Sequence, residues 1–206
     1  MTVLIKICGL TDAHAVHAAV NAGADAIGFV FFEKSPRNLA PEAAARLAAE
    51  VPSGIRRVAV MLHPQKALWN EVSDALRPDV LQTDSDDFSY LEVDKDIEKW
   101  PVLREGSVPD NGALPATFVY EGRQSGQGRT VDWDCAAGIA RRGRMILAGG
   151  LSIDNVAEAI ARVAPYGVDV SSAVESAPGQ KDAALIAAFI AAAKSADRET
   201  SEGNMT

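Results

Sequence analysis

The chain has 206 residues, of which 48% are hydrophobic and 23% are charged, and these values are typical of a folded globular domain with one core. It carries 20 lysines and arginines against 28 aspartates and glutamates, and the resulting net charge of −8 at pH 7 disfavours nucleic acid and anionic membranes as partners. The N-terminus lacks a signal-peptide pattern and no apolar run approaches the ~18 residues of a membrane span, so we expect a cytoplasmic protein.

Short apolar runs rich in Val, Ile and Phe alternate along the chain with longer alanine-rich stretches of helical period. The apolar runs predict eight strands, at residues 3–9, 24–32, 56–62, 80–83, 101–108, 117–122, 145–150 and 167–172. The stretches between them predict helices at 12–23, 41–51, 64–76, 131–143, 154–164 and 182–196. A polar segment, 86–94, follows the fourth strand, and only a short stretch broken by glycine and proline separates the fifth strand from the sixth.

The alternation of strands and helices predicts parallel strands joined by right-handed crossovers. Eight such units close into a (β/α)8 barrel, and 206 residues is near the lower limit for that fold. An open doubly wound sheet is the alternative, but it would show a glycine-rich fingerprint after the first strand, where CGLTDA has one glycine. We therefore predict an α/β protein with a single (β/α)8 TIM barrel over residues 1–195 and a disordered polar tail over 196–206.

The reacting groups of such a barrel lie at the carboxyl ends of its strands. The first strand ends at Cys8 and the sixth at Glu121, so a thiol and a carboxyl are expected on the same rim. Lys6 shares a strand face with Cys8, and its ammonium would make the thiol acidic unless a carboxylate such as Asp169 already neutralises it. The alternative is that Cys8 is a small buried hydrophobe. Together with Cys135 it forms neither a disulfide framework nor a metal-ligand spacing.

Small residues follow the seventh and eighth strands. Gly149 and Gly150 remove side chains from the seventh loop, just before a predicted helix, and Ser171 and Ser172 offer hydroxyl and N–H groups after the eighth strand. Phosphate groups bind where backbone N–H groups and a helix N-terminus converge, and barrels of this kind commonly hold phosphate at these two loops. We therefore predict a phosphate site there, although paired glycines that only permit a tight turn are the alternative.

Five segments in chain order, KICGLTD, FVFFEKSPRNL, SGQGRTVDW, LAGGLSIDNV and VDVSSAVE, resemble phosphoribosylanthranilate isomerase of tryptophan biosynthesis. Each segment is a weak signal alone, but together they are specific and extend from the first strand to the eighth. The resemblance implies an Amadori rearrangement of N-(5-phosphoribosyl)anthranilate to 1-(2-carboxyphenylamino)-1-deoxyribulose 5-phosphate, without metal or coenzyme. The expected partner is this small phosphorylated substrate, and we expect a monomer or a weak homodimer.

The resemblance also implies roles for single residues. Cys8 would be the general base that removes the proton from C2 of the sugar, and Glu121 stands where the family carries an aspartate as general acid. Arg37, from the SPR segment, would hold the anthranilate carboxylate, and Asp169 would face the pocket near the base. The phosphate would be held by the glycines and serines of the last two loops, namely Gly149, Gly150, Ser171 and Ser172.

The chain departs from the family pattern at three strand ends. The fourth strand ends LQTD, where the family has a QLHG-like end with a histidine, and the third ends AVMLHP, which contains His63. The third departure is Glu121, whose extra methylene requires a compensating shift of the pocket, because a misplacement of about 1 Å can cost on the order of 100-fold in rate. Two other functions therefore remain open: another sugar-phosphate barrel enzyme such as an epimerase or lyase, or a non-catalytic phosphate-binding barrel.

Overall fold

Eight parallel strands form a closed barrel in the computed structural model, which describes residues 2–108, 112–123 and 130–203, with side chains as far as 198. The strands follow one another around the barrel in chain order, and the eighth pairs with the first. They are β1 (Leu4–Cys8), β2 (Ala26–Phe31), β3 (Arg56–Met61), β4 (Val80–Asp84), β5 (Glu98–Arg104), β6 (Thr117–Glu121), β7 (Arg144–Leu147) and β8 (Gly167–Val170). The predicted (β/α)8 barrel is confirmed.

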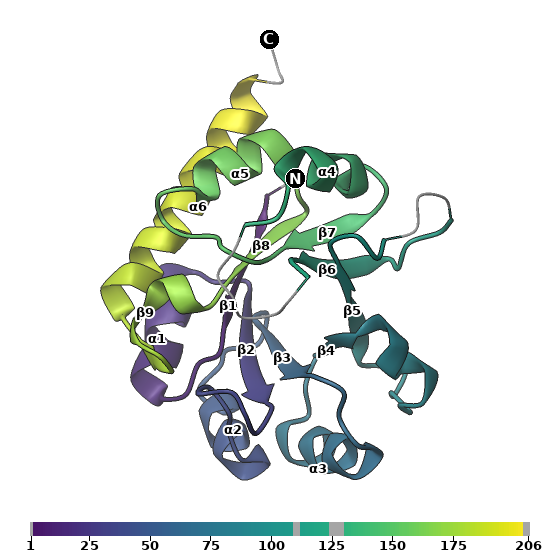
Figure 1. Ribbon diagram of the computed structural model, residues 1–206. Coiled ribbons are helices and arrows are strands. Elements are labelled where there is room, and N and C mark those ends of the chain that lie inside the picture. Colours follow the sequence, from purple (N-terminus) through teal and green to yellow (C-terminus); the bar gives the residue numbers. More distant parts are fainter. Residues whose placement is uncertain (1, 109–111, 124–129, 204–206) are drawn as a thin grey trace.

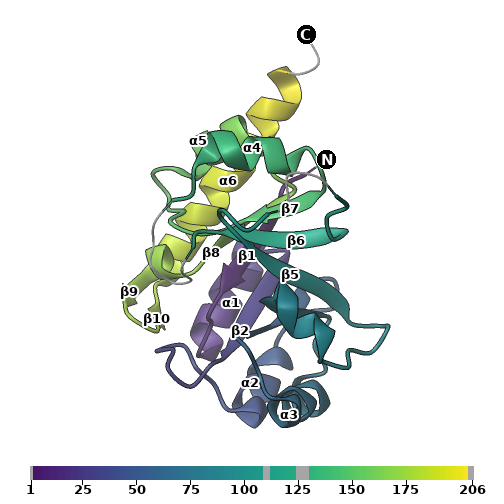
Figure 2. The ribbon, with the colours of Figure 1, turned by 45° about the vertical axis from the view of Figure 1, so that its right-hand side comes forward.

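Helices cover the outside of the barrel (Figure 1). They are α1 (Ala13–Ala22), α2 (Pro41–Ala48), α3 (Lys66–Leu76), α4 (Trp133–Ala140), α5 (Val156–Val163) and α6 (Ala183–Gly203). A short 3-10 helix, η1 (Ser85–Ser89), follows β4 in place of an α-helix. The last helix, α6, packs against α1 and α5, and its C-terminal end projects beyond the barrel (Figure 2).

Three features differ from the sequence-based expectation. Strand β5 begins at Glu98 rather than at 101, because Trp100 packs inside the barrel with Val80 and Val102 although a proline follows it. A 3-10 helix, η2 (Ser172–Val174), and a hairpin of two short strands, β9 (Glu175–Ala177) and β10 (Gln180–Lys181), lie between β8 and α6. The backbone of α6 continues to Gly203, where a polar tail was predicted from 196, and the domain boundary remains a prediction.

The two faces of each strand have different surroundings. On β1, Ile5 and Ile7 pack against the helices, whereas Leu4 belongs to an apolar cluster inside the barrel. Lys6 and Cys8 follow Leu4 at intervals of two, so both side chains point inside, as their spacing predicted. The same spacing directs polar side chains of other strands inward at their carboxyl ends: Gln82, Asp84, Arg104, Glu121 and Asp169. The barrel interior is therefore apolar at one end and polar at the other.

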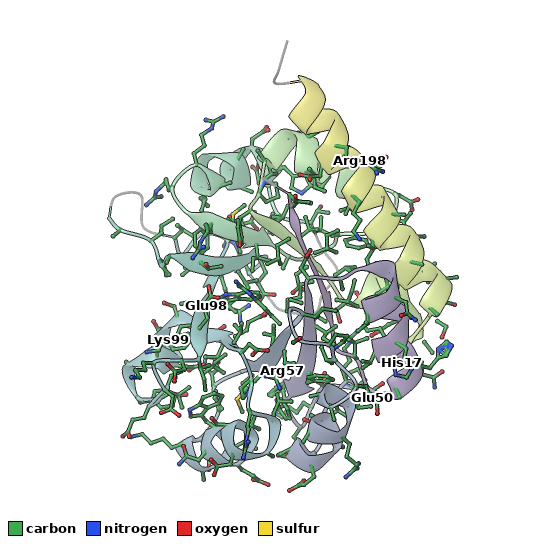
Figure 3. The ribbon with its side chains drawn as sticks, turned by 180° about the vertical axis from the view of Figure 1, so that it is seen from behind. His17, Glu50, Arg57, Glu98, Lys99 and Arg198 are labelled. Carbon is green, nitrogen blue, oxygen red and sulfur yellow. The ribbon has the colours of Figure 1, made fainter. Side chains whose placement is uncertain are left out.

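The outer surface carries ion pairs between neighbouring elements (Figure 3). His17 on α1 lies 3.5 Å from Glu50 after α2, and Arg57 on β3 lies 2.9 Å from Asp79 before β4. Exposed pairs of this kind contribute roughly 0–1 kcal/mol each. Among the described residues, no helix is both long enough and apolar enough to cross a membrane.

Candidate active site

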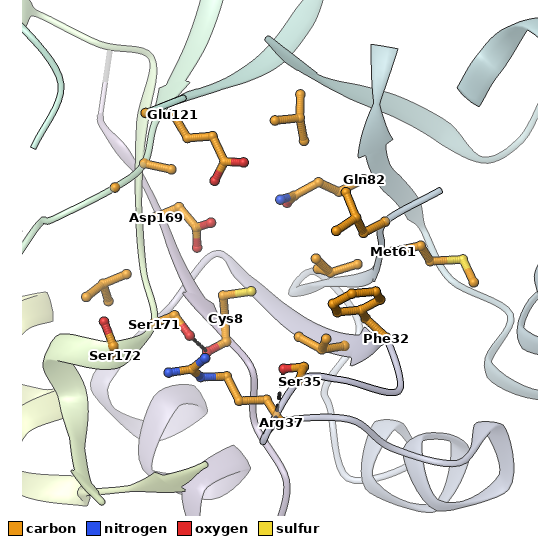
Figure 4. Close-up of a pocket in the computed structure, with 18 of the residues that line it drawn as sticks. Cys8, Phe32, Ser35, Arg37, Met61, Gln82, Glu121, Asp169, Ser171 and Ser172 are labelled. Atoms are coloured by element: carbon orange, nitrogen blue, oxygen red, sulfur yellow. Dashed lines mark hydrogen bonds between the residues drawn. The ribbon is translucent and has the colours of Figure 1, made fainter. Parts of the chain in front are cut away.

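A cavity of about 390 Å³ opens at the carboxyl ends of the strands (Figure 4). Its volume lies within the range of roughly 300–1,000 Å³ that is typical of small-molecule sites. Its lining includes every residue predicted for the site: Cys8, Arg37, Glu121, Gly149, Gly150, Asp169, Ser171 and Ser172. The strand ends thus bring together side chains that are up to 164 positions apart in the printed sequence.

The Cys8 thiol lies beside an ion pair. Lys6 Nζ lies 2.8 Å from Asp169 Oδ2, and the Lys6 side chain has no exposed surface. Burial raises the pKa of the Cys8 thiol above its usual value, and Lys6 opposes this effect without overcoming it. The acidic thiol that Lys6 alone would produce is therefore not present in the free protein, because burial outweighs the effect of the ammonium and Asp169 raises the pKa of the thiol further.

Two buried side-chain oxygens on the cavity wall have no hydrogen-bond partner among the described residues. They are Oδ1 of Asp169 and Oε1 of Gln82. Burial also raises the pKa of the Asp169 carboxyl, despite the opposing effect of Lys6. Because buried polar atoms are normally hydrogen-bonded, these oxygens are available to accept hydrogen bonds from water or from the hydroxyl or N–H groups of a ligand.

Arg37 is held by a carboxylate of the hairpin that follows β8. Its Nε and Nη2 atoms donate to the two oxygens of Glu175 at 2.7 and 2.8 Å. Lys181 Nζ approaches the same carboxylate to 2.6 Å, and these two cations lower the pKa of Glu175 although burial works to raise it. Gly9 adopts a positive φ of 76°, and a Cβ there would collide with Arg37 Cδ. One carboxylate therefore fixes two cations, and Gly9 leaves the space that one of them needs.

The loops after β7 and β8 are held by side-chain hydrogen bonds. Gly149 and Gly150 have positive φ values of 87° and 65°, a conformation that favours glycine. Asn155, at the start of α5, donates to the Gly150 carbonyl at 2.8 Å. After β8, Ser171 Oγ donates to the Cys8 carbonyl at 3.1 Å, and Lys181 Nζ donates to the Ser171 carbonyl at 2.8 Å. Both loops therefore have a fixed backbone at the cavity rim.

Glu121 reaches the cavity from the end of β6 (Figure 4). An arginine from the neighbouring strand binds its carboxylate. Arg104 Nη1 lies 2.7 Å from Glu121 Oε1, and Arg104 Nη2 lies 2.5 Å from Asp84 Oδ1. Both partners of Arg104 line the same cavity. A guanidinium thus links the ends of β4, β5 and β6.

Comparison with known proteins agrees with this geometry. The sequence model of the N-(5'-phosphoribosyl)anthranilate (PRA) isomerase family matches residues 5–192. The chain belongs to this family. An N-(5'-phosphoribosyl)anthranilate isomerase of Pelobacter propionicus is 41% identical over 204 residues, covering 95% of this chain and 98% of that protein.

Solved structures of the same family have the same fold. TrpF from Jonesia denitrificans is 38% identical, with a TM-score of 0.80, over 97% of this chain and 98% of that chain. A phosphoribosyl anthranilate isomerase solved in complex with reduced 1-(o-carboxyphenylamino)-1-deoxyribulose 5-phosphate is 28% identical, with a TM-score of 0.78, over 94% of this chain and 100% of that chain. The resemblance seen in the sequence is thereby confirmed.

Some polar residues of this isomerase-family cavity had no role in the sequence analysis. They are Gln82, Asp84 and Arg104 on the wall, and Glu175 and Lys181 behind Arg37. Counting in steps of two from the buried Val80 and Val102 identifies the three wall residues as inward-facing. Periodicity gives no signal for Glu175 and Lys181, because they lie on a short hairpin, although Glu175 ends the VDVSSAVE segment that resembles the family.

Proposed function

We propose that the protein catalyses the Amadori rearrangement of N-(5-phosphoribosyl)anthranilate to 1-(2-carboxyphenylamino)-1-deoxyribulose 5-phosphate, with Cys8 as the general base and Glu121 as the general acid. Membership of the isomerase family supports the activity. The observation that supports these residue roles is that the thiol and the carboxyl line one cavity whose rim carries the loops after β7 and β8.

The rearrangement begins with two proton transfers, one to the substrate and one from it, and it involves no net gain or loss of atoms. A proton from Glu121 goes to the ring oxygen of the ribose, and the C1–O bond breaks as the nitrogen lone pair forms a C=N bond. Cys8 then removes the proton from C2, which gives an enolamine. The enolamine becomes the ketone by gaining a proton at C1 and losing the proton of its C2 hydroxyl. Because acid and base suffice for these steps, we expect no metal or coenzyme.

The substrate carries two anionic groups, and the cavity offers a place for each. We assign the phosphate to Gly149 and Gly150 after β7 and to Ser171 and Ser172 after β8. We assign the anthranilate carboxylate to Arg37, whose Nη1 has no hydrogen-bond partner among the described residues. These local groups must act against the overall charge of −8.

The pH dependence follows from the two ionisable groups. An unperturbed thiol is only about 3% ionised at pH 7, and the raised pKa of Cys8 lowers this fraction further. Because the reaction needs a thiolate and a protonated carboxyl together, kcat/KM should follow a bell-shaped pH profile.

The test follows the fluorescence of the anthranilate adduct as purified protein consumes it. We expect turnover by the unaltered protein and a loss of at least about 100-fold in kcat for both Cys8→Ser and Glu121→Gln. Cys135→Ser is the matched control and should leave kcat unchanged. Full activity of both site variants would overturn the residue roles, and no turnover by a protein that still binds inorganic phosphate would favour the non-catalytic barrel.

The assembly state and the compartment remain sequence-based predictions. A monomer or weak homodimer is expected, and sedimentation of the purified chain over a range of concentrations would decide between these states. The cytoplasm is the expected compartment, and fractionation of the native cells would test it.

A further inference from the structure

Charged groups at the ends of β3, β4, β5 and β6 form one continuous network beside the cavity. His63, which follows β3, has Nε2 3.3 Å from Asp84 Oδ2, and Asp84 is bound in turn by Arg104. Arg104 then binds Glu121, the residue opposite it in the register of β5 and β6. The network therefore alternates in charge along four neighbouring strands when His63 is protonated, and it ends at the carboxyl that we propose as the acid.

Arg104 is the central member of this network. Its side chain is 21% exposed, and those of Asp84 and Glu121 are 17% and 15% exposed, so solvent screens these contacts only in part. Burial works to lower the pKa of the Arg104 guanidinium, but Asp84 and Glu121 raise it overall. Without this cation, two carboxylates on the wall of one cavity would repel each other.

The flexibility of the Glu121 side chain explains why its carboxyl needs a partner such as Arg104. Glutamate has one more rotatable bond than aspartate, so its carboxyl is less restricted at a given strand end. Arg104 Nη1 binds Oε1 at 2.7 Å, and the opposite end of the same planar guanidinium is fixed by Asp84 at 2.5 Å. A rigid group anchored at both ends thus fixes one oxygen of the flexible carboxyl.

The three departures from the family pattern meet in this network. The end of the third strand contains His63, the fourth strand ends LQTD with Asp84 as its last residue, and the sixth strand ends with Glu121. The structure joins them through Arg104, so a change at one of them alters the electrostatic surroundings of the others.

We propose that Arg104 is a positioning residue that holds the Glu121 carboxyl in place for proton transfer, with Asp84 fixing the guanidinium from its other side. This inference rests on the proposed function, since it concerns the acid of that reaction. Arg104 also favours the ionised form of the carboxyl, and Asp84 weakens this effect by taking part of the guanidinium. Arg104 therefore favours loss of the proton from the Glu121 carboxyl, whereas Asp84 favours its retention.

Other charged groups around this carboxyl must be considered in any titration. His63 follows β3 and Asp87 lies within η1, and His63 Nδ1 is 2.9 Å from Asp87 Oδ1. The neutral pair of Lys6 and Asp169 lies on the β1 and β8 side of the barrel. Arg123 follows Glu121 after β6. These groups remain unchanged in the variants below, so differences in titration or in kcat between the variants reflect the substitution of Arg104 or Asp84.

The experiment compares Arg104→Met, Arg104→Lys and Asp84→Asn with the unaltered full-length protein. Carbon-13 NMR of labelled glutamate side chains follows the carboxyl of Glu121, assigned by its disappearance in Glu121→Gln, while the fluorescence assay gives kcat. We expect Arg104→Met to lose on the order of 100-fold in kcat and to shift the titration midpoint to higher pH. Asp84→Asn should shift the midpoint to lower pH, and Arg104→Lys should fall between Arg104→Met and the unaltered protein.

The matched control is Arg57→Met, which removes another arginine bound to an aspartate, at the opposite end of β3. It should leave both the midpoint and kcat unchanged, and inorganic phosphate binding should show that every variant keeps a folded cavity. Two results would overturn the inference even if the protein is an active isomerase. One is that the Glu121 titration midpoints of Arg104→Met and Asp84→Asn do not move in opposite directions, and the other is an unchanged kcat in Arg104→Met. A fully active Glu121→Gln would instead overturn the acid role, and this inference with it.

Discussion

Burial and the neighbouring ion pair of Lys6 and Asp169 together set the ionisation state of the Cys8 thiol. Asp169 binds Lys6 at 2.8 Å, so the ammonium beside the thiol is already neutralised. With a neutral pair as its neighbour, the thiol responds mainly to its own burial, which raises its pKa. At the scale of single residues, the thiolate fraction of Cys8 therefore depends on the charge of Asp169.

Asp169→Asn tests this dependence by removing the charge while keeping the size of the side chain. The unopposed Lys6 ammonium should lower the pKa of the Cys8 thiol, and each unit would raise the alkylation rate about tenfold below that pKa. Iodoacetamide labelling as a function of pH, followed by mass spectrometry of the Cys8 peptide, measures this rate. The exposed Cys135 provides an internal reference in the same sample.

The control for that experiment removes both charges. Lys6→Met combined with Asp169→Asn should return alkylation of Cys8 to the slow rate, because no cation then lies beside the thiol. Breaking a buried pair on one side costs about 3–5 kcal/mol, so urea unfolding must first show that the single variant is folded at the assay temperature. An unchanged labelling rate in the folded single variant would contradict the explanation.

The hairpin formed by β9 and β10 is the element that the sequence analysis did not detect, and it supports two parts of the site. Lys181 on β10 binds the Ser171 carbonyl of the β8 loop and the Glu175 carboxylate of β9. Glu175 in turn binds Arg37. The hairpin therefore connects the β8 loop, which we propose for the phosphate, to the arginine that we propose for the anthranilate carboxylate.

Lys181→Met should weaken phosphate binding by roughly tenfold, because a hydrogen bond from a charged group contributes about 1.5–3 kcal/mol and the β8 loop loses this contact. Calorimetric titration with inorganic phosphate measures the change. Lys194→Met is the matched control, since Lys194 also donates to a backbone carbonyl, that of Ala22 at the C-terminal end of α1. Equal binding by the two variants would contradict a supporting role for the hairpin.

The strands of the barrel could be predicted from the sequence because each is a short apolar run set between longer stretches of helical period. The spacing of two predicted that Lys6 and Cys8 share a face, and the place of Glu121 at the end of a barrel strand predicted that it lies on the cavity rim. The pairing of Arg104 with Glu121 could not be predicted, because it depends on the register between β5 and β6 and on side-chain reach. Long-range partners of this kind are set by barrel closure and leave no periodic signal in the chain.

At the scale of the whole molecule, several carboxyl groups make stability depend on pH. Arg57 lowers the pKa of Asp79, and Arg37 with Lys181 lowers that of Glu175, in both cases against the effect of burial. A carboxyl with a lowered pKa in the folded state stabilises the fold above its unfolded value, and this contribution is lost as the pH falls through the folded value. Asp169 contributes to the pH dependence of stability with the opposite sign, since burial raises the pKa of its carboxyl.

The free energy of unfolding should therefore fall as the pH is lowered below about 4, where the carboxylates with lowered pKa values become protonated. Urea unfolding at a series of pH values between about 3 and 6 measures this slope. Arg57→Met should flatten the slope in the most acidic part of the range, because Asp79 then loses the partner that lowers its pKa. The pair lies at the amino end of the barrel, so the isomerase activity of the variant at neutral pH should be unchanged. A slope that is the same in both proteins would show that Asp79 does not contribute to acid sensitivity, and the remaining slope would then belong to other carboxyl groups, Glu175 among them.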